Sequence, residues 1–219
     1  NKQHVACSLS DLGHRVLYVE SLGIRGANTS TKDLVRIFKR IIKGFRTPKK
    51  VYKNIWVWSP IVIPGASNRI ILDVNRKIIS IGLRINLLII GLRYDWLWTY
   101  NPLIRRFLNI QIFSKTIYHA VDAIQEQPNM PKLLIEKEER KLCQLVDYVF
   151  ATSPQIESSL SPYSKRIRYD PNCCDYNHFS KAIEISNENI PNDLLEISSP
   201  RIGFIGAISS YKLDFNLIS

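Results

Sequence analysis

The chain has 219 residues, of which 45% are hydrophobic and 22% charged, and its formal net charge is +11. This composition is typical of a globular protein with a buried core and excludes a disordered or fibrous chain. Two of the four cysteines are sequence neighbours and none forms a C-x-x-C pair, which suits neither a disulfide framework nor a zinc site and favours reduced thiols in a cytosolic protein.

Strands and helices alternate along the chain, and this order predicts an α/β fold with a Rossmann-like, doubly wound parallel sheet. Several expected strands are near-continuous apolar runs, as in sheets covered on both faces. Gly13 is expected to end the first helix. The expected helices are residues 2–12, 31–43, 67–92 and 131–145, and the expected strands are residues 15–20, 54–60, 96–100, 116–121, 148–152 and 167–169.

Both ends of the chain are expected to be incomplete. A doubly wound domain normally opens with a strand and a tight turn, whereas this chain begins in a helix, so the first strand is expected to be missing. We assign residues 1–179 to the first domain and the polar residues 180–199 to an interdomain linker. Residues 200–219 are interpreted as the first strand and turn of a truncated second domain.

Positive charge is concentrated between Asp33 and Asp73, a window without acidic residues. Within it, residues 34–43 have the apolar spacing of an amphipathic helix, whose cations are Arg36, Lys39, Arg40 and Lys43. These cations form either the solvated face of a domain helix or a surface for an anionic membrane or acceptor. A nucleic-acid partner is not expected, because no base-stacking platform, zinc knuckle or helix-turn-helix pattern accompanies the charge.

A membrane span is not expected in this chain. The best candidate, residues 78–92, is shorter than the about 20 apolar residues that a span needs and contains Arg84 and Asn86. We therefore interpret it as a buried helix and expect any membrane association to be peripheral. No signal peptide is visible either.

The predicted strands end on polar or turn-forming residues. Because ligands of open parallel sheets bind outside the carboxyl ends of the strands, these residues are expected to form the rim of a site. They are Glu20, Ser59, Pro60, Asn101, Pro102, residues 119–122, Ser153, Pro154, Pro171 and Asn172. The tryptophans on two of these strands could stack on sugars, but alternation along a strand favours core packing for at least half of them; they are Trp56, Trp58, Trp96 and Trp98.

Six segments resemble, in order and spacing, the N-terminal half of a bacterial GT-B glycosyltransferase of the teichuronic-acid and exopolysaccharide biosynthesis type. They are residues 13–20, 98–102, 118–122, 150–154, 171–179 and 201–208, so the resemblance extends over nearly the whole chain. It implies two Rossmann-like domains, of which the first binds the acceptor and the second binds the nucleotide-sugar donor. On this resemblance, the chain would end just after the second domain begins.

The resemblance implies an enzyme that transfers a sugar from a nucleotide sugar to a cell-surface polysaccharide or lipid-linked acceptor. The nucleotide sugar is the substrate, no cofactor or metal is implied, and the fragment alone is expected to be inactive. The expected location is the cytoplasm, with peripheral contact to the inner face of the membrane. The competing interpretation is a non-catalytic α/β binding module, or a degenerate glycosyltransferase that scaffolds a polysaccharide-synthesis complex.

The resemblance also assigns roles to individual residues. His119 matches a strand-end histidine near the donor sugar in retaining members, and a structural histidine bonded to backbone is the alternative. Asp122 is expected to orient His119, to accept a proton, or to make loop hydrogen bonds. The residues that match the donor-binding loop are Gly206, Ser209 and Lys212.

One departure from the family pattern lies in residues 171–179. Cys173 and Cys174 replace the usual glycine and valine, whereas Asp175 and Phe179 match. A cysteine in a turn that needs positive φ would be strained. Neutral sequence drift or a plain buried pair of small apolar side chains is favoured here over a reactive cysteine pair.

Overall fold

The computed structural model describes residues 2–21, 47–63, 68–185, 190–206, 208 and 213–218. Contacts within the chain divide it into two compact units, Asn1–Pro171 and Asn172–Ser219. The first unit contains every described strand and every described buried side chain. It is therefore the unit in which a site can be built on a packed scaffold.

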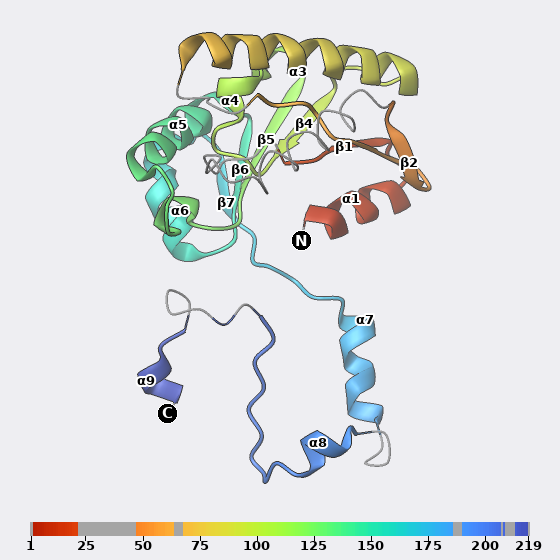
Figure 1. Ribbon diagram of the computed structural model, residues 1–219, viewed down its shortest axis with the longest axis vertical. Helices are drawn as coiled ribbons and strands as arrows, with labels where there is room; N and C mark the ends of the chain where they lie inside the picture. Colours follow the sequence, from red (N-terminus) through yellow and green to blue (C-terminus); the bar gives the residue numbers. More distant parts are fainter. Residues whose placement is uncertain are drawn as a thin grey trace. The chain divides into compact units, whose positions relative to one another are not determined.

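The first unit contains two sheets (Figure 1). The smaller has the order β1-β3-β2, in which β1 and β3 are parallel and β2 is antiparallel to β3; its strands are β1 (Val16–Val19), β2 (Lys49–Tyr52) and β3 (Ile55–Trp58). The larger is entirely parallel, with the order β4-β5-β6-β7; its strands are β4 (Trp96–Thr99), β5 (Lys115–Ala120), β6 (Tyr148–Ala151) and β7 (Ile167–Tyr169).

Helices flank these sheets. Those of the first unit are α1 (Lys2–Asp11), α3 (Arg69–Ile90), α4 (Ile104–Phe107), α5 (Lys132–Leu145) and α6 (Pro154–Leu160). Short 3-10 helices are η1 (Ile110–Ile112), η2 (Ile124–Glu126) and η3 (Ser161–Tyr163). The first unit is thus an α/β structure with a parallel sheet flanked by helices, as predicted, and its topology is compatible with a Rossmann-like fold.

The long helix α3 packs closely on β3 because of one glycine. A Cβ atom at Gly82 would lie 2.6 Å from the ring of Trp58, a core residue that is only 4% exposed. Asn68 caps the start of α3 by accepting a hydrogen bond from the Ile70 amide, and Gly91 ends it with φ of 64°. These sequence signals explain why the helix begins and ends close to the predicted residues.

The helix α5 is joined to β5 by a buried polar contact. The hydroxyl of Tyr118 donates a hydrogen bond to the carboxylate of Glu139, and both side chains lie in the interior. Burial raises the pKa of Glu139, opposed by this hydrogen bond, and raises that of the neighbouring Cys143 thiol to about 12. Tyr118, Ala120 and Val149 face this helix-covered core, so the alternate residues of β5 and β6 face the other side of the sheet.

Most predicted elements of the first unit are confirmed to within two residues, including the end of α1 at Gly13, where φ is 90°. The expected helix at residues 31–43 lies outside the described residues. The strand β2 and the helix α6 were not predicted. The interpretation of residues 78–92 as a buried helix is wrong for one side of α3, where Ile81, Ile85 and Leu88 are exposed.

The second unit has no buried side chain among its described residues. Its helical segments are α7 (Tyr176–Phe179), η4 (Ser180–Glu184), α8 (Asn192–Leu195) and α9 (Phe215–Ile218). Residues 200–206, predicted as a strand, have no regular secondary structure. A strand needs a hydrogen-bonded neighbour, and no described residue supplies one here. The assignment of residues 180–199 as a linker and 200–219 as the start of a second domain stays a prediction.

Candidate functional site

Four aromatic side chains gather toward the carboxyl ends of β4, β5 and β6. We call them the aromatic–histidine cluster; they are Trp98, Tyr100, His119 and Phe150. His119 and Phe150 are register partners on β5 and β6. Their strand neighbours Tyr118, Ala120, Val149 and Ala151 are buried, so strand alternation places the cluster on the other face of the sheet.

The rings of the cluster contact one another. The imidazole of His119 stacks on the ring of Tyr100, with centroids 5.0 Å apart and planes 29° apart. Trp98 stacks on Phe150 at 5.9 Å, and His119 meets the edge of Phe150 at 6.1 Å. The ammonium of Lys2, at the start of α1, lies 5.3 Å from the centroid of the Tyr100 ring. The cluster is therefore an aromatic surface with a cation at its border.

Three members of the cluster have buried polar atoms for which no described residue has the geometry of a hydrogen-bond partner. The indole nitrogen of Trp98, the hydroxyl of Tyr100 and both ring nitrogens of His119 are buried and have no hydrogen-bond partner among the described residues. Buried polar groups of this kind are rare in folded proteins, because each one loses its hydrogen bonds to water without replacement. Several such atoms on neighbouring side chains therefore make the cluster a candidate binding site for a polar ligand.

Burial also sets the protonation of the cluster. It lowers the pKa of His119, and the distant charge of Asp170 only partly opposes this effect. The imidazole is therefore neutral at neutral pH, with one nitrogen able to donate and the other able to accept a hydrogen bond. Burial and the nearby Tyr18 together raise the pKa of Tyr100 to about 12, and an interaction with the Trp98 side chain partly opposes the rise. Its hydroxyl consequently remains a proton donor over the whole physiological range.

Asp122 makes no hydrogen bond to His119, whose ring nitrogens have no partner among the described residues. The Asp122 side chain is exposed. Its backbone carbonyl accepts a hydrogen bond of 2.9 Å from the Ile124 amide, at the turn into η2. In this structure Asp122 therefore does not orient His119. Its expected role as a proton acceptor stays a prediction.

Other residues of the expected rim are used by local structure. Asn101 accepts a hydrogen bond from the Leu103 amide, and Ser153 caps α6 by accepting one from the Ile156 amide. Ser59 donates to the carboxylate of Glu20, which joins the ends of β3 and β1. These contacts explain the polar residues without a ligand. Among the rim side chains discussed here, His119 is distinguished by two buried nitrogens that such contacts leave unsatisfied.

The remaining predicted site residues fall into two groups. Gly206 is described and exposed, in the second unit. Those outside the described residues are Ser209, Lys212, Arg36, Lys39, Arg40 and Lys43. The donor-loop role of Gly206, Ser209 and Lys212 and the acceptor or membrane role of the basic helix therefore stay predictions.

The expected burial of Cys173 and Cys174 is wrong, because both thiols are exposed. Their backbone is also free of the expected strain. Asn129 is the non-glycine residue with positive φ in the described part of the chain, so neither cysteine adopts the glycine-like conformation. The loop accommodates the two cysteines by a different backbone path.

Sequence reasoning missed the partners of His119. Tyr100 and Phe150 lie in segments that resemble the glycosyltransferase family, but the resemblance assigns them no role, and Trp98 is one of the four tryptophans considered for sugar stacking. Of these, Trp58 is buried in the core, Trp96 is 65% exposed, and Trp56 and Trp98 are partly buried. Aligning the strand ends in a parallel sheet would have placed Tyr100, His119 and Phe150 together.

Comparisons with known proteins give no assignment. No protein-family model matches the chain, and no curated protein matches its sequence. Among the described residues, no group of three or more His, Cys, Asp and Glu side chains is placed to hold a metal ion. None of the described helices has the length and hydropathy needed to cross a membrane.

Proposed function

We propose that the first unit is the acceptor-side domain of a GT-B glycosyltransferase and that the aromatic–histidine cluster binds a saccharide. The observation that carries the proposal is the set of unpaired, buried polar atoms on Trp98, Tyr100 and His119, toward the carboxyl ends of parallel strands. Ring faces stack on the apolar faces of sugars, while indole, phenol and imidazole groups exchange hydrogen bonds with sugar hydroxyls. The α/β architecture with its parallel sheet supports the same proposal.

In the proposed reaction, a hydroxyl oxygen of the acceptor forms a bond to the anomeric carbon of a nucleotide sugar. The bond between that carbon and the diphosphate oxygen breaks, the nucleoside diphosphate leaves with the bonding electrons, and the hydroxyl proton passes to a base. The neutral imidazole of His119 would hydrogen-bond a sugar hydroxyl and hold it in position. Asp122, which follows β5, remains the candidate proton acceptor.

The test measures release of nucleoside diphosphate from a panel of nucleotide sugars in the presence of lipid-linked and polysaccharide acceptors. The 219-residue chain is assayed alone and together with any sequence that flanks it in its gene. Where activity is found, His119→Ala should lower it about a hundredfold, because a positioned hydrogen-bonding group is lost. The matched control is His14→Ala, which changes an exposed histidine in the turn after α1.

The two sequence-based interpretations predict different results. A transferase gives acceptor-dependent release that falls in His119→Ala and not in His14→Ala. A non-catalytic binding module gives saccharide binding at the cluster without release of nucleoside diphosphate. Activity that is equal in the two variants would contradict the role proposed for His119.

A further inference from the structure

The helix α3 is apolar on two sides, but only one side is covered. Its inner side packs in the core through Ile79, Leu83, Leu87 and Ile90. Its outer side carries large aliphatic residues that we call the α3 stripe; they are Ile70, Val74, Ile81, Ile85, Leu88 and Ile89. Ile70 is 74% exposed and Leu88 is 70% exposed. A row of large exposed aliphatic side chains on a protein surface is typical of an interaction site, so a binding partner is expected on the outer side.

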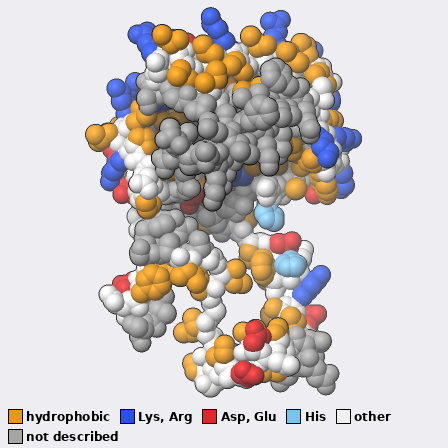
Figure 2. All heavy atoms as spheres, viewed as in Figure 1, with side chains coloured by type: hydrophobic (Ala, Val, Ile, Leu, Met, Phe, Trp, Pro, Cys, Tyr) orange, Lys and Arg blue, Asp and Glu red, His pale blue; other side chains and the backbone are white. Residues whose placement is uncertain are grey.

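The α3 stripe is continuous. Its members recur at intervals of three, four and seven residues, which places them along one line on the helix surface. From Ile70 to Leu88 the line is roughly 27 Å long at 1.5 Å per residue. Figure 2 shows hydrophobic side chains gathered over α3, with Lys and Arg side chains around them. This is the pattern of a helix that lies in the plane of a membrane interface.

Positive charge borders the stripe. The charged residues of α3 are Arg69, Asp73, Arg76, Lys77 and Arg84, four cations and one anion. Lys77 and Arg84 lie seven residues apart and flank Ile81 and Leu88 along the helix. All four cations are exposed. The border of the stripe therefore favours an anionic surface.

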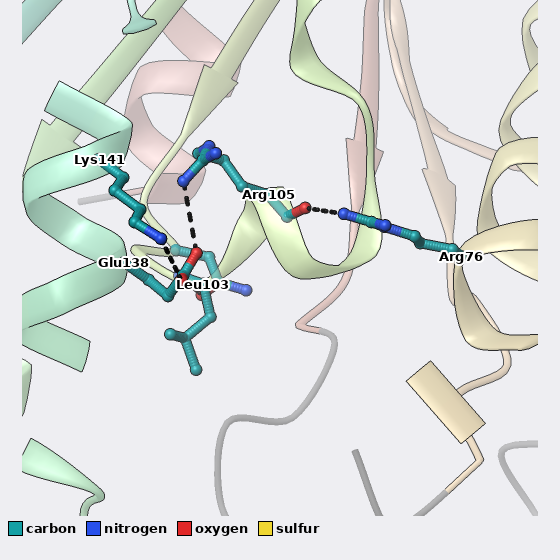
Figure 3. Close-up of polar contacts among 6 residues, drawn as sticks. Arg76, Leu103, Arg105, Glu138 and Lys141 are labelled. Carbon is teal, nitrogen blue, oxygen red and sulfur yellow. Dashed lines mark hydrogen bonds and ion pairs between the residues drawn. The ribbon is translucent and has the colours of Figure 1, made fainter. Parts of the chain in front are cut away.

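A groove of about 660 Å³ adjoins this basic border. Its charged and polar lining comes from α3 and from the segment that contains α4 and η1: Arg76, Lys77, Ser80, Arg105, Asn109 and Gln111. Arg76 donates a hydrogen bond of 3.0 Å to the backbone carbonyl of Arg105, and the Arg105 guanidinium lies 3.4 Å from Glu138 (Figure 3). Ile81 lines both the groove and the stripe.

The charge and the amino-acid composition of the α3 stripe and its border indicate what binds to this surface. A second copy of the chain would place the cations of α3 against the same cations of its partner, since a two-fold interface pairs identical patches. Protein interfaces are also enriched in aromatic residues, whereas the stripe contains only isoleucine, valine and leucine. An anionic bilayer matches both the aliphatic stripe and its cationic border, because it has an apolar interior and negatively charged headgroups.

We propose that α3 docks the chain on an anionic phospholipid bilayer. The α3 stripe enters the headgroup region, Lys77 and Arg84 contact lipid phosphates, and the adjoining groove accepts one headgroup phosphate. This surface consists of residues other than the basic helix expected at residues 31–43. The inference holds whether or not the chain acts on sugars, and its test measures no sugar transfer.

The test is vesicle flotation of the 219-residue chain. One set of vesicles contains phosphatidylcholine alone, and the other contains phosphatidylcholine and phosphatidylglycerol in equal parts. We expect binding to the mixed vesicles that weakens with added salt, and little binding to the neutral ones. Equal binding to both sets would overturn the proposal.

Paired variants assign the binding to α3. Leu88→Gln should weaken binding to mixed vesicles about tenfold, while Leu12→Gln, which changes a leucine of similar exposure after α1, should leave it unchanged. Lys77→Gln with Arg84→Gln should weaken binding about thirtyfold, because two cations are removed from the anionic surface. The charge-matched control is Lys49→Gln with Lys165→Gln.

Two results would overturn the inference even if vesicles are bound. The first is equal binding by each variant and its control, which would place the membrane contact elsewhere on the chain. The second is a self-association in analytical ultracentrifugation that Leu88→Gln abolishes, which would make a second copy the occupant. Circular dichroism spectra of all variants verify that the helices are retained.

Discussion

At the scale of single residues, the unusual feature of this chain is a histidine whose ring is placed among aromatic side chains without hydrogen bonds. His119 stacks on Tyr100, and both of its nitrogens lack a partner among the described residues. Unpaired buried polar atoms reduce stability, so a chain that keeps them gains something else from them. Ligand binding by these atoms is the gain that we propose.

His119 should titrate below the ordinary histidine value of about 6.5. Burial lowers its pKa in the folded chain, so the unfolded chain takes up a proton first as the pH falls through this range. Stability contributed by the neutral ring is therefore present above the unfolded pKa and is lost as the pH falls toward the folded pKa. Histidine-selective NMR checks the pKa, and a value above the ordinary one of about 6.5 would contradict it.

His119→Phe should keep the stacked ring and remove both unpaired nitrogens. We expect this variant to be at least as stable as the parent chain at pH 8 and to gain relative stability at pH 5, where the parent histidine is driven toward protonation. Urea unfolding at the two pH values measures the difference. A large loss of stability at pH 8 would instead indicate that the His119 nitrogens make structural hydrogen bonds.

The buried hydroxyl of Tyr118 gives a second prediction at this scale. Tyr118→Phe removes the donor to Glu139 and leaves a buried carboxyl group without a partner, so it should destabilise the fold by about 1–3 kcal/mol. Tyr148→Phe is the control, because the Tyr148 hydroxyl accepts an exposed hydrogen bond from Arg166. Its effect should stay within about 0.5 kcal/mol. Equal effects in chemical unfolding would contradict the structural role of the Tyr118 hydroxyl.

At the scale of elements, the contact between α3 and β3 depends on the absence of a side chain at Gly82. Gly82→Ala would gain about 1 kcal/mol of helix propensity, but its Cβ would clash with the rigid, buried ring of Trp58. We expect a net destabilisation of about 1 kcal/mol, measured by urea unfolding. Ser80→Ala, at an exposed position of the same helix, should be neutral or slightly stabilising. A more stable Gly82→Ala variant would contradict the close packing.

Helices and strands with a strong apolar pattern could be predicted from the sequence. Elements that form only through contacts with other segments could not. The apolar runs of β4, β5 and β6 and the periodicity of α3 and α5 located these elements closely. β2 was missed because all four of its residues are exposed and two are lysines, so it has no apolar alternation. α6 was missed although Ser153 and Pro154 carry the signal of a helix start.

The candidate site was predicted only in part for the same reason. His119 could be found from its place at a strand end. Its contacts with Tyr100 and Phe150 depend on the register between strands, which no single segment contains. The exposure of the α3 stripe could likewise not be predicted, because the sequence of an apolar helix does not show which of its sides another element will cover.

At the scale of the whole molecule, the two units differ in what stabilises them. The described buried side chains all lie in Asn1–Pro171, and the described residues of Asn172–Ser219 include none. Burial of apolar surface is the main stabilising contribution in folding. The first unit therefore contains the stable core of the chain.

Hydrogen exchange should reflect this difference. We expect slow exchange for amides of β5, β6 and α5, and fast exchange for the described residues from 172 onward, which lack a core to protect them. Exchange followed by mass spectrometry makes the measurement. Protection after residue 171 comparable to that of β5 would contradict the assignment of all core stability to the first unit.

The most direct test of the central proposal follows the tryptophan indole N–H signals by NMR while nucleotide sugars and oligosaccharides are added to the 219-residue chain. The indole of Trp98 should shift on saccharide binding because its unpaired N–H gains a partner, and the imidazole of His119 should shift with it. The indole of Trp58, which packs against Gly82 in the core, serves as the internal control. Saccharide binding that leaves the Trp98 and His119 signals unchanged, or no binding of any sugar in the panel, would contradict the proposed site.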